Sequence, residues 1–95
     1  MKKEKIENFL NNLSYIYNNK DISLKEKTRQ EIIKQYKKLE NGSTNLAYAS
    51  YALYPYIKEE SYAIKDEKFH DFLKLLEKNK WKAYFGMVLG SAFAK

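Results

Sequence analysis

Few residues in this chain have side chains that could carry chemistry. Histidine occurs once, as His70, paired acids occur at 59–60 and 66–67, and cysteine is absent. A metal site needs several histidine, cysteine or carboxylate ligands that converge on one point. The spacing does not supply such a set, so we expect no metal site. We expect His70 to be a surface or half-buried residue and the acids to be solvated or to cap helices.

Other catalytic signatures are also missing from the sequence. The serines are not set in a glycine-flanked nucleophile elbow with a partner base. No glycine-rich loop resembles those that cradle phosphate groups. The sequence therefore predicts no catalytic residues and no cofactor, and it favours a protein that acts by binding rather than as an enzyme.

The chain is strongly basic, and lysine supplies almost all of its positive charge. The net charge is +6 and the single arginine is Arg29. Arginine is the usual residue for bidentate contacts with phosphate and guanine, so this charge is weak support for a nucleic-acid partner. Glu4 and Glu7 interrupt the N-terminal stretch, so no signal peptide is expected. The lack of cysteine suits a reducing, cytoplasmic location.

Apolar residues recur at helical spacing in the first half of the chain. Residues 6–17 predict one helix, which the polar residues 18–21 end. Ser23 and Glu26 match a capping box for a second helix, which Asn41-Gly42 would close. The expected core stripes are Ile6, Phe9, Leu10, Leu13, Ile16 and Tyr17, then Leu24, Thr28, Ile32, Tyr36 and Leu39, with Ile33 widening the second stripe.

The stretch LAYASYALYPYI, residues 46–57, is rich in tyrosine and alanine. Leu46, Ala49, Ala52 and Leu53 fit a third helix, capped by a residue from 43–45. Alternation in the same stretch leaves a strand conceivable, although alanine disfavours it. Pro55 predicts a kink or an end of this helix near 53–56. The tyrosines suit bundle packing with wet edges, a protein-contact surface or base stacking.

A fourth helix is expected after Asp66 as its N-cap. Its apolar stripe is Phe69, Phe72, Leu73 and Leu76, and its end is expected at 78–80. A short fifth helix from Trp81 is an alternative for the tail, which Gly86 and Gly90 weaken. Four helices with short links predict an all-α, antiparallel four-helix bundle in one domain, residues 1–95.

The last part of the chain, residues 79–95, combines basic and apolar residues. The twelve residues 83–94 are uncharged, which is too few to span a bilayer. We expect this segment to pack partly on the bundle through Phe85, Val88 and Leu89. Residues 78–95 carry four lysines and no acid, which suits an anionic membrane surface or a membrane-embedded partner. The candidate partner-binding residues are Lys78, Lys80, Trp81, Lys82, Tyr84 and Phe85.

The stretch from about 32 to 78 contains QYKKLENG, then LAYASYALYPYI, then SYAIKDEKFHDFLKLLEK. In this order of features the chain resembles the cytosolic immunity proteins of class IIa (pediocin-like) bacteriocins, among them the enterocin A immunity proteins. The resemblance implies an antiparallel four-helix bundle. It also implies protection without turnover: the protein docks from the cytosolic face onto the bacteriocin-bound membrane components of the mannose phosphotransferase system and blocks the pore.

Two features depart from the family's pattern, Pro55 inside the third helix and the apolar finish of the chain. The alternatives are a basic helical nucleic-acid-binding or regulatory protein, and a phage-type adaptor that dimerises. The location implied by the resemblance is cytoplasmic, with peripheral contact at the inner membrane face. The sequence leaves self-association and the bacteriocin that is countered open.

Overall fold

The computed structural model describes the backbone of residues 2–93 and the side chains of residues 4–83. Its four helices are α1 (Lys2–Asn18), α2 (Glu26–Glu40), α3 (Leu46–Ser61) and α4 (Glu67–Phe93). Within residues 2–93 there is no strand, so the strand alternative for residues 46–57 is wrong. The expected all-α four-helix bundle is confirmed.

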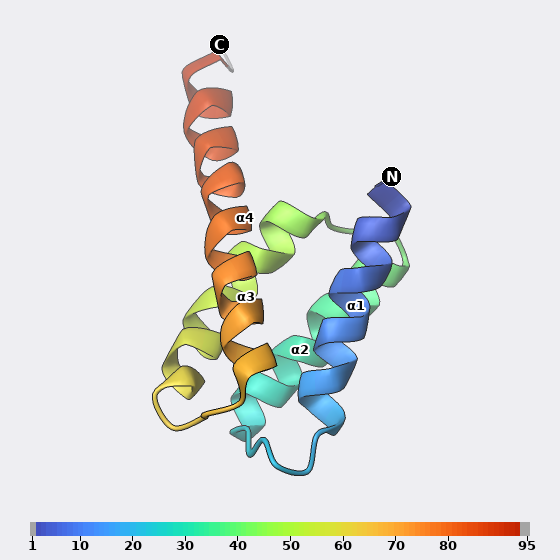
Figure 1. Ribbon diagram of the computed structural model, residues 1–95. Helices are drawn as coiled ribbons and strands as arrows, with labels where there is room; N and C mark the ends of the chain where they lie inside the picture. The colour runs from blue at the N-terminus through green and yellow to red at the C-terminus, as the bar shows by residue number, and fades with distance from the viewer. Residues whose placement is uncertain (1, 94–95) are drawn as a thin grey trace.

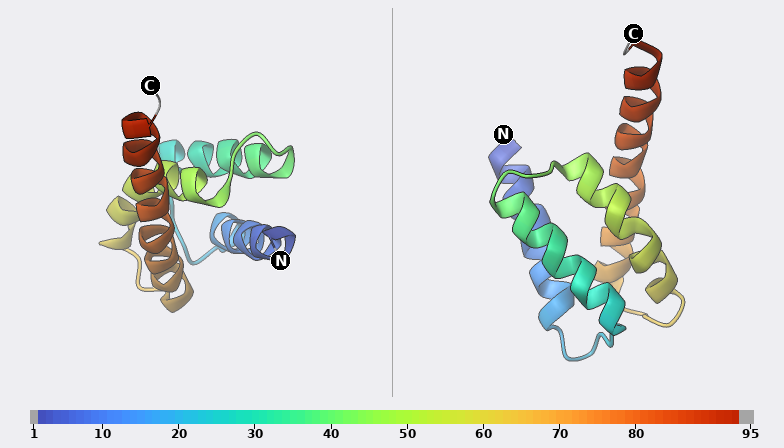
Figure 2. Two further views of the ribbon diagram at one scale, coloured as in Figure 1. Left: turned by 90° about the horizontal axis from the view of Figure 1, so that it is seen from above. Right: turned by 180° about the vertical axis from the view of Figure 1, so that it is seen from behind.

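Consecutive helices run antiparallel in the bundle (Figure 1). The closest packing is between α3 and α4, followed by that between α2 and α3. Helix α1 lies beside α2 and contacts α4 through Phe9 and Phe72, whose ring centroids are 5.2 Å apart. Helix α4 is the longest, and its last turns run past the ends of the other helices (Figure 1 and the right view of Figure 2).

The core contains one inward-facing stripe from each helix, as the apolar spacing predicted. Ile33 is an exception, because it is 38% exposed and lies outside the core. Ile57 and Ile64 extend the core at the end where α3 turns into α4. The buried apolar side chains are Phe9, Leu13, Ile16, Ile22, Ile32, Leu39, Ala49, Leu53, Ile57, Ile64, Phe69, Phe72, Leu76 and Ala83.

Two predicted helix caps are confirmed. The Asn45 carboxamide oxygen accepts a hydrogen bond from the Tyr48 backbone N–H at 2.9 Å, which caps α3. The Asp66 carboxylate accepts one from the Phe69 backbone N–H at 3.0 Å, which caps α4. Gly42 has a φ of +77°, the left-handed conformation expected after a helix that glycine ends. Two side-chain caps and one left-handed glycine therefore mark three of the helix boundaries.

The capping box predicted at Ser23 and Glu26 is wrong. Lys25 precedes α2 and caps it without a side-chain hydrogen bond. The backbone N–H of Lys25 instead donates to the carboxylate of Glu60, at 2.8 Å. Glu60 is buried near the end of α3, and a buried carboxylate needs such donors. A contact between helices therefore replaces the local cap.

Pro55 lies within α3, and the helix does not end there but continues to Ser61. A proline inside a helix leaves the carbonyl four residues earlier without its amide partner. That carbonyl belongs to Tyr51. Both Pro55 and Tyr51 are on the exposed side of the helix, where water can hydrate the carbonyl. The placement of Pro55 on this face explains why the bundle tolerates it.

Helix α4 does not end at 78–80, and residues from Trp81 onward do not form a separate fifth helix. They continue α4 without a break to Phe93. Residues 78–83 contain neither glycine nor proline, so nothing local stops the helix there. The two later glycines each cost about 1 kcal/mol relative to alanine, which weakens a helix without ending it. The expected packing of Phe85, Val88 and Leu89 concerns side chains outside the described residues.

The cap of α4 gives a direct test of the fold. Replacing Asp66 with alanine removes the acceptor of the Phe69 N–H and of the Tyr15 hydroxyl. It should lower the free energy of unfolding by about 2 kcal/mol, roughly 1 kcal/mol from each contact. Asp66→Asn is the matched control, since asparagine caps about as well and should retain most of the stability. Urea unfolding followed by circular dichroism measures both. Equal losses in the two variants would contradict a capping role.

Candidate interaction surfaces

The basic segment of α4, defined here as Lys78, Lys80, Trp81 and Lys82, is the candidate site predicted from the sequence. The structure does not gather its side chains into one patch. Residues four apart share a helix face, whereas residues two apart point about 200° from each other. Lys78 and Lys82 are accordingly on one face, and Lys80 is on another. The side chains of Tyr84 and Phe85 lie outside the described residues.

Lys80 is held against α3 rather than left in solvent. Its ammonium nitrogen lies 3.8 Å from the centroid of the Tyr54 ring. This is a cation–π contact, and such a contact is stronger when the lysine is partly dehydrated. The Tyr54 hydroxyl donates to the Glu77 carboxylate at 3.3 Å. Tyr54 is thus held between a cation and an anion from α4. This contact is consistent with the rotation of α4 that its buried stripe of Phe69, Phe72 and Leu76 sets.

Trp81 is the exposed aromatic residue of the basic segment. Its side chain is 49% exposed, and the ammonium of Lys80 lies 5.2 Å from its ring. Lys78 and Lys82 are exposed as well. Of the predicted residues with described side chains, these three present polar or aromatic surface to a partner, and Lys80 does so only in part.

Lys78 and Lys82 border a hollow of about 290 Å³ where α1, α3 and α4 meet. We call it the basic hollow. Lys5 of α1 is the third lysine at its rim, and the sequence reasoning missed it because only the fold brings α1 to this end of α4. The floor is largely apolar. The lining residues are Lys5, Asn8, Phe9, Leu46, Ala47, Leu75, Lys78, Asn79 and Lys82.

The tyrosines of α3 divide between packing and exposure. Tyr54 and Tyr56 are half-buried, whereas Tyr48 and Tyr51 are 45% and 47% exposed. Tyr62, just after the helix, is 80% exposed and lies near the ammonium of Lys58. The packing interpretation therefore accounts for part of this cluster, and Tyr48 and Tyr51 remain available for contact with a partner.

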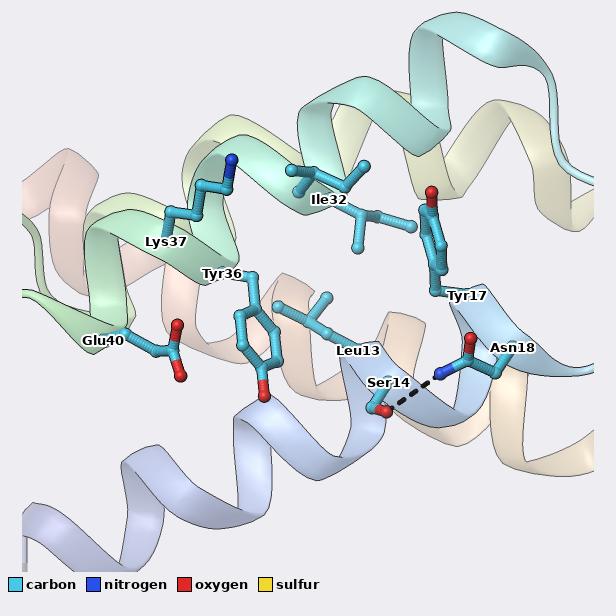
Figure 3. Close-up of a pocket in the computed structure, with 9 residues that line it drawn as sticks. Leu13, Ser14, Tyr17, Asn18, Ile32, Tyr36, Lys37 and Glu40 are labelled. Carbon is cyan, nitrogen blue, oxygen red and sulfur yellow. Dashed lines mark hydrogen bonds between the residues drawn. The ribbon is translucent and has the colours of Figure 1, made fainter.

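A second hollow, of about 380 Å³, lies between α1 and α2. Figure 3 shows Tyr36 reaching from α2 toward α1 and Tyr17 reaching from α1 toward α2. Arg29 covers the Tyr17 ring, with 4.1 Å between its guanidinium carbon and the ring centroid. Ile33, the apolar residue left outside the core, lines the same hollow. This groove is mostly apolar and is separate from the basic segment.

The residues considered first for chemistry have structural contacts. The His70 ring Nε2–H donates to the Ile64 carbonyl at 2.6 Å. The Glu59 carboxylate pairs with Lys25 at 2.7 Å and with Lys27 at 3.3 Å. Hydrogen bonds from these two lysines lower the pKa of Glu59. In the described part of the chain, no three histidine or acidic side chains lie together as a metal site would require.

Known proteins offer no further assignment for these surfaces. The chain matches no family model, no curated protein and no solved structure. Over the residues that the structure describes, no helix combines the length and the apolar character needed to cross a bilayer.

Tyr54 allows the α3–α4 contact to be tested through pH. Burial, and then the neighbouring Glu77 carboxylate, raise the pKa of Tyr54 above its ordinary value near 10. A raised pKa in the folded state means that this contribution to stability is present below about pH 10 and is lost as the pH rises through the folded-state pKa.

We therefore expect the free energy of unfolding to fall less between neutral pH and about pH 11 in Tyr54→Phe than in the parent protein. The variant keeps an aromatic ring against Lys80, so the comparison isolates the hydroxyl. Urea titrations at the two pH values measure the difference. Parallel losses in the two proteins would show that the Tyr54 hydroxyl does not ionise differently in the folded state.

Proposed function

We propose that this chain is a bacteriocin immunity protein that acts by binding and without catalysis. In this role it sits in the producing cell and docks from the cytosolic face onto the bacteriocin-bound membrane components of the mannose phosphotransferase system. The docked protein blocks the pore that the peptide would otherwise form. The proposal starts from the resemblance of residues 32–78 to the class IIa immunity proteins.

The fold supports this proposal to the extent that the resemblance implies an antiparallel bundle of four helices, which is the architecture observed. Residues 32–78 form the end of α2, all of α3 and the first part of α4. The departure at Pro55 is accommodated within a continuous α3. The other departure, the apolar finish, continues α4 as a helix beyond the bundle.

The observation that carries the proposal is the exposure of Lys78, Trp81 and Lys82 at one end of the bundle, where the long helix leaves it. Tryptophan is enriched at protein interfaces, where its large ring supplies much of the contact energy. Lysines at the rim improve the orientation and rate of encounter with an acidic partner. These residues would contact the receptor assembly.

The test is protection of a sensitive strain that expresses the chain and is challenged with several class IIa peptides. The parent chain should protect against at least one of them. The variant Lys78→Glu/Lys82→Glu should lose that protection while keeping its helical circular dichroism, because it reverses two exposed charges that make no ion pair within 4.0 Å among the described residues.

The matched control is Lys34→Glu/Lys38→Glu, which makes the same change in net charge at exposed positions of α2. It should protect as well as the parent chain does. Unchanged sensitivity to every peptide in cells that express the parent chain would reject the proposed function. Equal protection by the two charge-reversed variants would reject the assigned surface.

A further inference from the structure

The end of α4 extends beyond the helices that pack against it. Leu46, the first residue of α3, lines the basic hollow together with Lys78 and Lys82 of α4. Helix α3 therefore begins at this level, and α4 continues past it to Phe93. We call residues 84–93 the arm. At 1.5 Å per residue, the arm adds about 15 Å of helix. Figure 1 and the right view of Figure 2 show it projecting from the bundle.

The sequence of the arm is unusual for a helix that leaves a bundle. Residues 83–94 contain no charged residue and include phenylalanine, methionine, valine and leucine. A helix that is apolar on all sides needs an apolar environment over its whole surface. None of the other three helices continues alongside the arm (Figure 2). The described parts of the other helices therefore do not enclose the arm, and a partner outside the chain could supply that environment.

The charges around the arm indicate what that environment is. Lys78 and Lys82 stand just before it on α4, and Lys5 of α1 joins them at the rim of the basic hollow. Glu4 and Glu7, on the first turns of α1, offset part of this charge, while Glu77 accepts the hydrogen bond from the Tyr54 hydroxyl. A second copy of the chain, packed arm to arm in parallel, would bring two such groups of lysines together. An anionic lipid surface would attract them.

We propose that the arm binds in the interface of a bilayer that contains anionic lipid. The lysines lie among the phosphates, Trp81 sits at the headgroup level, and the arm is immersed at the boundary between the headgroups and the acyl chains. A lysine also follows the uncharged run, as Lys95. Because lysines lie at both ends of the uncharged run, all of them can reach lipid phosphates only when the run lies along the membrane surface. This inference does not rest on the proposed immunity function.

Trp81 provides the measurement, because it is the only tryptophan of the chain. The full chain is mixed with vesicles of phosphatidylcholine plus phosphatidylglycerol, and separately with vesicles of phosphatidylcholine alone. We expect a blue shift of the Trp81 emission and co-sedimentation with the anionic vesicles, and much weaker binding to the neutral ones. Lipids brominated near the headgroup should quench the emission more than lipids brominated near the chain ends.

Two variants separate the apolar and electrostatic contributions. Leu89→Glu places a charge in the arm and should abolish the blue shift. Its control is Ile33→Glu, at an exposed apolar residue of α2, which should bind as the parent does.

Lys78→Gln/Lys82→Gln should weaken binding about 25-fold, because each lysine near an anionic surface contributes about fivefold to the affinity, or about 1 kcal/mol. Lys34→Gln/Lys38→Gln is the control with the same net charge.

Several results would overturn the inference. The first is absence of binding to anionic vesicles. The second is unchanged vesicle binding by Leu89→Glu, which would mean that the lysines alone hold the protein at the surface. The third combines two observations: no vesicle binding, and reversible self-association in sedimentation that Leu89→Glu abolishes. This result would show that the arm binds a second copy of the chain. Because the vesicles contain no receptor and no bacteriocin, these results stand apart from the protection assay.

Discussion

The structure depends on the turn that joins α3 to α4, because this turn fixes where two helices of unequal length begin to pair. Asp66 caps α4 and also accepts a hydrogen bond from the Tyr15 hydroxyl of α1 at 3.1 Å. The His70 ring donates to the Ile64 carbonyl on the other side of the turn. The helices contain 16 and 27 residues. Because the two helices are aligned at this end, the extra length of α4 over α3, about 16 Å, extends beyond α3 at the opposite end. The basic segment lies there.

Local signals in the sequence predicted much of the fold. Asn45, Asp66 and Gly42 act on their own helix termini, so residue type and position suffice to place them. The core stripes follow from spacing along a single helix. The capping box at Ser23 failed because Glu60, thirty-five residues away from Lys25, supplies the acceptor. Whether a local cap forms depends on which partners the tertiary structure brings to it, and a short motif does not contain that information.

The sequence suggested residues for the candidate site, which stay a prediction, but it did not give their full arrangement. The helical repeat alone separates Lys80 from Lys78 and Lys82. The residues that surround the basic segment could not be predicted from the helical repeat. Tyr54 of α3 and Lys5 of α1 come close to it only through the packing of the helices. The continuity of α4 was also missed. Glycine and lysine-rich stretches often mark helix ends, yet neither stops a helix that has no competing turn.

The rotation of α4 about its axis connects the fold to both proposals. The buried stripe of α4 sets that rotation, so Lys78 and Lys82 lie at the basic hollow and Lys80 lies against Tyr54 of α3. A planar anionic surface that meets the arm therefore meets Lys78, Lys82 and Lys5 on one side of the molecule, while Lys80 stays on Tyr54. Binding would orient the bundle, not merely concentrate it. If both proposals hold, a protein held in one orientation on the membrane would search for its receptor in two dimensions with most of its rotational freedom already lost. Less entropy would then be lost in the final docking step.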